Sequence, residues 1–227
     1  MKNRVITGTF IVGAFLVAYF AFDGAAFSAL TLFCLLMALM EIYVTLDSMP
    51  CMVQPKLCHP HGAFAYEITV LIVATALCAL MSREELALVI CTSMMADVGA
   101  FAVGSFIGKH KVKFLAKISA KKSYEGFVGA IVIGGLATYA LCWLLKIPLG
   151  AAMWAYIALG GITAAIGDLL GSASKRQLGV KDSGEILALS HGFRWIEAPM
   201  RGHGGYLDRF DSIALSLVVY SLLHFML

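Results

Sequence analysis

The sequence predicts an all-α polytopic membrane protein, a bundle of about seven transmembrane helices. The chain has 227 residues, of which 60% are hydrophobic and only 14% are charged. Apolar stretches recur along it, and the basic residues gather in alternate connections between them. A soluble domain carries roughly a quarter charged residues, and a core of this size cannot hide so much apolar side chain from water. The bilayer is therefore the expected solvent.

Seven apolar segments approach the length of about 20 residues that a helix needs to cross a bilayer. We expect spans at residues 5–22, 25–46, 63–81, 86–107, 124–145, 151–171 and 210–227. The first follows the sequence MKNR and has no convincing small-residue cleavage site, so we expect an uncleaved span. We divide the chain into N-terminal spans, residues 1–85, and a catalytic membrane region, residues 86–227.

The lysines and arginines set the expected orientation. With the N-terminus inside, fifteen of the seventeen basic residues lie on the inner side, and only Arg83 and Lys146 lie outside. The inner segments are then residues 1–4, 47–62, 108–123 and 172–209. This positive-inside bias predicts an N-in, C-out topology with a polar site that faces the cytosol.

Five acidic residues lie within or at the edge of the apolar segments, where a carboxylate is costly unless it is paired or faces water. They are Glu41, Glu67, Asp97, Glu125 and Asp168. We expect structural pairing for Glu41 and Glu67, and an ion pair of Glu125 with the neighbouring lysines. Asp97 and Asp168 lie in the inner halves of their helices, close to glycines, which favours a functional role. Two seams of small residues, Gly104-x-x-x-Gly108 and Gly167-x-x-x-Gly171, predict close helix packing.

The last inner segment has the densest pattern of polar residues. Asp208 and Asp211 are three residues apart, so their carboxylates share a face if a helix starts there. Together with Asp182 they form a candidate site for a hard divalent cation. Cations interleaved with these acids suit a substrate that carries several phosphates. These cations are Lys175, Arg176, Lys181 and Arg209. Two glycines after His203 let the backbone approach a ligand, and the whole pattern indicates phosphate-ester chemistry at a membrane surface.

At these positions the sequence resembles the phosphatidate cytidylyltransferases, also called CDP-diacylglycerol synthases. The matching residues, in order, are Ser172, Lys175, Arg176, Lys181, Asp182, Gly184, His203, Gly204, Gly205, Asp208, Arg209 and Asp211. Earlier matches are Asp97-x-Gly99-Ala100, Ser119-x-Lys121-Lys122-Ser123-x-Glu125-Gly126 and Gly167-Asp168. The resemblance covers residues 90–215, and the preceding part of the chain matches only as hydrophobic spans.

Three features depart from the family pattern. Ser174 stands where an apolar residue is usual, and Arg201-Gly202 stands where proline-glycine is usual. The link between Gly184 and His203 is longer than the family's and contains a second histidine, His191. We expect His203 to be the site histidine, because Asp-Arg-x-Asp follows it.

The resemblance implies a reaction of CTP with phosphatidate to give CDP-diacylglycerol and pyrophosphate, at the cytoplasmic face of a bacterial inner membrane. It implies Mg²⁺ or Mn²⁺ on Asp182, Asp208 and Asp211, with a monovalent cation as a further candidate. The expected catalytic residues are Asp97, Asp168, Lys175, Arg176, Lys181, His203 and Arg209. The expected substrate-binding residues are Lys121, Lys122, Ser123, Glu125, Ser172, Gly204 and Gly205. Membrane lipids and a second copy of the chain are expected partners, and nucleic acid is not.

Other functions remain open at this stage. A related CTP-dependent enzyme would act on another lipid phosphate or on a polyprenol. The Asp-Gly-x-x-Ala-Arg pattern of the CDP-alcohol phosphotransferases is absent from the sequence. A transporter would spread its acids through several spans at mid-depth, whereas here they gather at one face. A polybasic scaffold would explain the charge of residues 108–123 but not the ordered pattern of residues 119–126.

The six cysteines lie mostly in apolar stretches, where we expect free thiols that behave as small hydrophobes. One cluster deserves comparison with metal sites: Cys51, Cys58, His59 and His61. Its spacing matches no zinc pattern, so we expect a cytosolic loop there without a metal.

Overall fold

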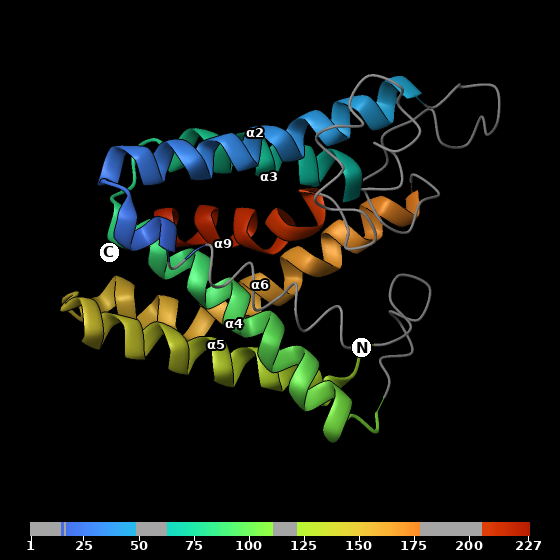
Figure 1. Ribbon diagram of the computed structural model, residues 1–227. Coiled ribbons are helices and arrows are strands. Elements are labelled where there is room, and N and C mark those ends of the chain that lie inside the picture. The colour runs from blue at the N-terminus through green and yellow to red at the C-terminus, as the bar shows by residue number, and fades with distance from the viewer. Residues whose placement is uncertain (1–14, 16, 49–62, 111–121, 178–205) are drawn as a thin grey trace.

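A computed structural model describes residue 15 and residues 17–48, 63–110, 122–177 and 206–227 (Figure 1). The regular structure of these ranges is helical, which confirms the expected all-α class. Its elements are α2 (Gly24–Ser48), α3 (Ala63–Cys78), α4 (Arg83–Phe106), α5 (Tyr124–Leu145), α6 (Ala151–Gln177) and α9 (Leu207–Met226). Five of them, α2, α4, α5, α6 and α9, are long and apolar enough to cross a membrane, and α3 is a shorter apolar helix.

The expected spans agree with these helices to different degrees. The bounds of α5 match the expected segment at residues 124–145. The first expected span, residues 5–22, lies mostly outside the described residues, so the number of seven spans stays a prediction. Helix α6 continues past its expected end at residue 171 to Gln177, and α9 begins at Leu207 instead of residue 210. The inner segment expected at residues 172–209 is therefore helical at both of its ends.

The helices form three pairs. Helices α2 and α3 lie along one side of the bundle, α4 and α5 along the other, and α6 and α9 lie between them (Figure 1). The helix ends that flank residues 49–62, 111–121 and 178–205 all lie at the same end of the bundle (Figure 1). This arrangement gathers the described helix ends that flank the three long inner segments of the sequence. Which side of a membrane that end faces stays a prediction.

Glycines bring α4 and α5 into backbone contact. A Cβ atom at Gly99 would lie 2.5 Å from the carbonyl oxygen of Gly129, and a Cβ at Gly129 would lie 2.6 Å from that of Gly99. Further along, a Cβ at Gly108 would lie 2.7 Å from Oγ of Ser123, at the start of α5. The seam expected at Gly104 and Gly108 is thus confirmed. Close backbone approach supplies dispersion contacts where lipid offers no hydrophobic driving force between helices.

The interior combines apolar side chains with a few polar pairs. Fully buried side chains include Phe27, Leu35, Leu71, Leu88, Tyr156 and Leu217. Oγ1 of Thr92 lies 2.8 Å from Oγ1 of Thr138, which joins α4 to α5 by a buried hydrogen bond. Large apolar side chains such as Phe101, Trp143 and Phe225 are exposed on the outside of the bundle, as expected for a surface that faces lipid. The described cysteines, Cys34, Cys78, Cys91 and Cys142, are free thiols.

Candidate active site

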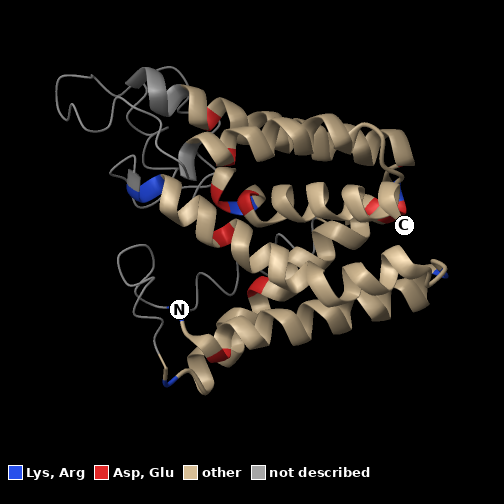
Figure 2. Ribbon diagram, turned by 180° about the vertical axis from the view of Figure 1, so that it is seen from behind, with Lys and Arg blue, Asp and Glu red and all other residues tan. Residues whose placement is uncertain are grey.

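Charged side chains enter the interior of the bundle near one of its ends. Figure 2 shows acidic and basic residues gathered in the half of the bundle nearest the grey segments, with further charges at the opposite tip. The helical extension of α6 places Ser172, Lys175 and Arg176 on its last turns. The early start of α9 places Asp208 and Arg209 in its first turn. The site is therefore built on two packed helices, where the sequence suggested a loop.

Lys175 lies between two carboxylates of α9. Its Nζ contacts Oδ1 of Asp208 and lies 3.7 Å from Oδ2 of Asp211. Only 9% of the lysine side chain, 13% of the Asp208 side chain and 3% of the Asp211 side chain are exposed. One ammonium group reaches both carboxylates, which confirms that they share a face of α9. Lys175 therefore joins the two carboxylates of α9 to α6.

A glycine of α6 makes room for this arrangement. A Cβ atom at Gly171 would lie 2.7 Å from Cβ of Asp211 and 2.8 Å from its Cγ. A Cβ atom at Gly167 would lie 2.7 Å from the carbonyl oxygen of Asp211. The seam expected at these glycines is confirmed, and the Asp211 carboxylate occupies the space that a side chain at residue 171 would need. The close packing of α6 on α9 and the position of this carboxylate therefore depend on the same two glycines.

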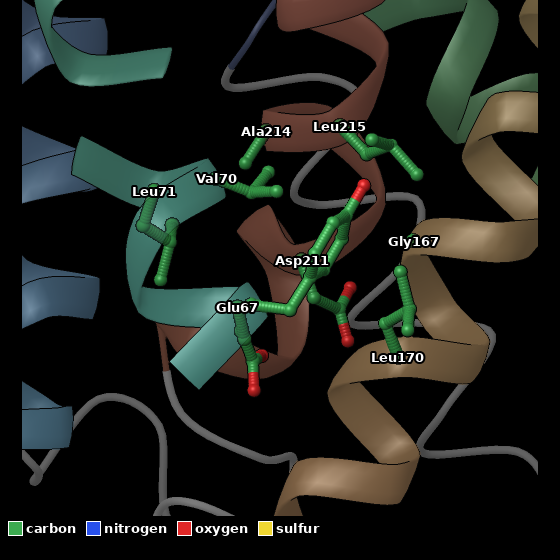
Figure 3. Close-up of a pocket in the computed structure, with 9 residues that line it drawn as sticks. Glu67, Val70, Leu71, Gly167, Leu170, Asp211, Ala214 and Leu215 are labelled. Atoms are coloured by element: carbon green, nitrogen blue, oxygen red, sulfur yellow. The ribbon is translucent and has the colours of Figure 1, made fainter. Parts of the chain in front are cut away.

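Glu67 adds a third buried carboxylate from α3. It lines a small cavity with Asp211, Gly167 and Leu170, and its carboxylate lies beside that of Asp211 (Figure 3). The residue is 4% exposed. Within the described ranges, neither of its carboxylate oxygens has a hydrogen-bond partner, and neither does Oδ2 of Asp211. Ser174 and Lys175 of α6 interact favourably with Glu67, so the structural pairing expected for it is seen as electrostatic contact without a well-formed hydrogen bond among the described residues.

These oxygen donors are of the kind that Mg²⁺ prefers. Asp208 and Asp211 are two of the three metal ligands expected from the sequence, and the third, Asp182, lies outside the described residues. No group of three or more Asp, Glu, His or Cys within the described ranges is arranged to hold a metal by itself. Oδ2 of Asp211 accepts no hydrogen bond within the described ranges, although Nζ of Lys175 lies 3.7 Å away, so it can serve as an oxygen ligand. A complete site would need further ligands from Asp182 or from the substrate.

A second polar group joins α4, α6 and α9 to the start of α5. Nζ of Lys122, just before α5, lies 2.7 Å from Oδ2 of Asp168 in α6. Oγ of Ser212 donates a hydrogen bond of 3.5 Å to Oδ2 of Asp97, which links α9 to α4. Asp97 is exposed, and 41% of the Asp168 side chain is exposed. Because Ser212 follows Asp211, this group and the Lys175 group meet on α9. The structure thus brings together Asp97, Lys122, Asp168, Lys175, Asp208 and Asp211 from four parts of the chain.

The start of α5 differs from expectation. Glu125 pairs with His110, whose Nδ1 lies 2.7 Å from Oε1 and whose backbone N–H donates to the same oxygen at 3.1 Å. Lys122, expected as a partner of Glu125, faces Asp168 instead. Oγ of Ser123 accepts a hydrogen bond of 3.1 Å from the backbone N–H of Gly126 and so caps the helix. In the described part of the chain, Ser123 and Glu125 position the start of α5, and their binding of substrate stays a prediction.

Glu41 is the site feature that sequence reasoning placed least well. The expected structural pairing is confirmed, but the partner is remote: Oε1 accepts from the backbone N–H of Tyr206 at 2.7 Å and Oε2 from that of Leu207 at 2.8 Å. A contact across 165 residues leaves no local signal in a single sequence. Six expected site residues lie outside the described ranges: Lys121, Lys181, Asp182, His203, Gly204 and Gly205. The cluster from Cys51 to His61 and the competing His191 also lie outside them.

Comparison with known proteins agrees with this geometry. Residues 82–227 match the model of a family described as the cytidylyltransferase family. A phosphatidate cytidylyltransferase of Mycobacterium bovis is 41% identical over 125 residues, which are 54% of this chain and 35% of that protein. Relatives of the same name from Staphylococcus saprophyticus and Staphylococcus aureus are 35% and 34% identical, over 57% of this chain and 44% of each relative. The matched part therefore spans less than half the length of these curated relatives. Since the family match covers well over half of the chain, this protein belongs to the cytidylyltransferase family.

Proposed function

We propose that the protein is a phosphatidate cytidylyltransferase, which transfers the cytidylyl group of CTP to phosphatidate and releases pyrophosphate. The observation that carries the proposal is the group of Lys175, Asp208 and Asp211, buried near one end of an apolar bundle. These residues match the family pattern, and the named relatives share the activity that the pattern implies.

The reaction needs alignment more than it needs a strong base. An oxygen of the lipid phosphate attacks the α-phosphorus of CTP, and the bond to the pyrophosphate leaving group breaks. The lipid phosphate is already an anionic nucleophile at neutral pH. The protein must therefore bring two anions together and stabilise the charge of the leaving group.

The residues divide into two roles in this proposal. Asp208 and Asp211, with Asp182, would hold Mg²⁺, which when bound neutralises charge on the triphosphate. Lys175 fixes the two carboxylates of α9 and adds positive charge beside them. Arg176 on α6 and Arg209 on α9 lie close in sequence to this group and are candidates to bind the leaving pyrophosphate.

Lys122 is the candidate contact for the lipid phosphate. The Lys122 side chain is 26% exposed and its ammonium pairs with the more exposed Asp168, so a phosphate can compete for it. Asp97 is exposed in the apolar second half of α4, where a carboxylate is stable if it faces water or a polar head group. A lipid phosphate held here keeps its acyl chains in the bilayer while its head group reaches the Lys175 group. The site would face the cytoplasm of a bacterial cell, where CTP is available.

A product assay with purified protein tests the proposal. Labelled CTP and Mg²⁺ would be supplied with phosphatidate, an ether-linked lipid phosphate or a polyprenyl phosphate, and the products separated by chromatography. We expect labelled CDP-diacylglycerol and pyrophosphate from phosphatidate. Product from another lipid phosphate alone would assign the chain to the related CTP-dependent class. No consumption of CTP with any lipid would overturn the proposal.

A further inference from the structure

The first turn of α9 receives its cap from α2. A helix begins with backbone N–H groups that have no partner within the helix, and a side chain near the start usually accepts from them. Tyr206, the residue before α9, makes no such side-chain bond, and two glycines precede it. Instead, the two oxygens of Glu41 accept from the N–H groups of Tyr206 and Leu207 at 2.7 and 2.8 Å.

This contact is well suited to fix α9 in position. Both hydrogen bonds have a charged acceptor, which makes them stronger than bonds between neutral groups. The carboxylate also lies at the positive end of the helix dipole. Glu41 is 3% exposed and Leu207 is 2% exposed, so water competes little for these bonds. Two bonds to successive residues restrict both the rotation of the first turn and its shift along the axis.

The turn that Glu41 holds carries the candidate site. Asp208 follows Leu207 directly, and Asp211 lies one turn further on. Both carboxylates must face Lys175 of α6. A small rotation of α9 would move both away from the lysine. Gly167 and Gly171 of α6 contact Asp211, one turn beyond the residues that Glu41 holds. Glu41 lies outside residues 82–227, the part of the chain that matches the family.

We propose that Glu41 is a positioning residue for the reaction: by capping α9 from α2, it sets the register of Asp208 and Asp211 against Lys175. The catalytic half of this statement rests on the proposed function. The structural half does not, because the cap is a property of the folded chain.

The test combines kinetics with hydrogen exchange of the full-length protein. In Glu41→Ala we expect kcat to fall by roughly 100-fold, the scale of a small misplacement of reacting groups, with a smaller change in KM for CTP. Glu41→Gln keeps one acceptor oxygen, so we expect partial rescue, to a loss of roughly tenfold. The amides of Tyr206 and Leu207 should exchange faster in both variants, and faster in Glu41→Ala than in Glu41→Gln. The amides at the centre of α9 should exchange as in the unsubstituted protein.

Thr31→Val is the matched control. Thr31 is also a buried polar residue of α2, and its hydroxyl donates to the carbonyl of Phe27 within the same helix. We expect kcat and the exchange of Tyr206 and Leu207 to match the unsubstituted protein. If Glu41→Ala does not fold, the glutamine variant gives the decision.

Three results would overturn the proposal: unchanged kcat in Glu41→Gln and Glu41→Ala, a loss of kcat without faster exchange at α9, or an equal loss in Thr31→Val. If the unsubstituted protein makes no CDP-diacylglycerol, the proposed function fails and the catalytic half of this proposal fails with it. Exchange at Tyr206 and Leu207 would then still decide whether Glu41 caps the helix.

Discussion

At the scale of single residues, the site is defined by buried carboxylates that gather around one buried lysine. Lys175 contacts Asp208 and lies 3.7 Å from Asp211, and Glu67 adds a carboxylate with no hydrogen-bond partner among the described residues. Burying charge is costly unless an opposite charge compensates it. Carboxylate oxygens gathered in this way are suited to a hard divalent cation, and the nearby arginines to a phosphorylated substrate.

The metal proposal is tested by Asp208→Asn. This change removes charge with almost no change in shape, so we expect the protein to insert and fold but to lose at least about 100-fold in kcat, comparable to the loss of one charge-stabilising group. Turnover of CTP in detergent, with gel filtration to confirm the folded state, is the measurement. Normal turnover in this variant, or full activity of the unsubstituted protein in excess chelator, would contradict the assignment.

Glu67→Gln tests whether the third carboxylate is uncompensated. The buried oxygens of Glu67 have no hydrogen-bond partner within the described ranges, so removing the charge should leave the melting temperature in chelator unchanged or higher. Melting would be followed with and without Mg²⁺. A marked fall in melting temperature in chelator would mean that neighbours such as Lys175 and Ser174 compensate the carboxylate.

At the scale of helices, α6 and α9 position the site through glycine. The Cβ of Asp211 lies only 2.7 Å from the position that a Cβ atom at residue 171 would take. The end of α6 and the start of α9 are helical where the sequence predicted a loop. The site therefore depends on a rigid contact between two helices, and changes of single methyl groups there should be felt in the chemistry.

Gly171→Ala should separate α6 from α9. Overpacking of a close contact typically costs about 1–3 kcal/mol, and we expect a lower melting temperature together with a larger fall in kcat. Gly150→Ala is the matched control, because a Cβ there would meet nothing within 4 Å. Equal activity of the two variants would show that the contact tolerates the methyl group and does not set the geometry of Asp211.

The sequence predicts some elements far better than others. Hydropathy alone places both ends of α5, where the structure shows a cap from Ser123 at the start and Lys146 in the left-handed conformation, with φ 55°, at the end. Hydropathy places the membrane part of α6 but misses its last turns, since the residues after Gly171 are polar. Those turns gain stability from the contacts of Lys175 with α9, which is a tertiary effect. The shared face of Asp208 and Asp211 was predictable from spacing, whereas the partner of Glu41 was not.

At the scale of the whole molecule, the two ends of the bundle differ. One end carries the candidate site and the helix ends that flank the long inner segments (Figure 2). Near the opposite end, the Arg83 guanidinium lies 4.6 Å from the ring centroid of Tyr19 and donates to the carbonyl of Phe22 at 3.1 Å. These contacts hold Tyr19 and Phe22 to the start of α4. The difference in charge between the ends is what the N-in, C-out prediction rests on.

Cysteine labelling tests that orientation. In a background without the native cysteines, Lys109→Cys and Lys181→Cys should resist a membrane-impermeant thiol reagent in intact cells and react after the membrane is opened. Lys146→Cys, at the C-cap of α5, should react from outside and serves as the control. Reaction from outside at residue 109 or 181 would place the site on the wrong side for CTP in the cytoplasm.

The cap on α9 also sets a limit on the smallest autonomous unit of this protein. A fragment of residues 82–227 would contain the whole segment that matches the family, with Lys175, Asp208 and Asp211 included. It would lack the carboxylate that holds the first turn of α9, and it would lack α2 and α3, which pack against that helix. The homologous segment and the cooperative unit of folding therefore have different boundaries. Helices α2 and α3 lie outside the family match, yet they pack against the helix that carries Asp208 and Asp211.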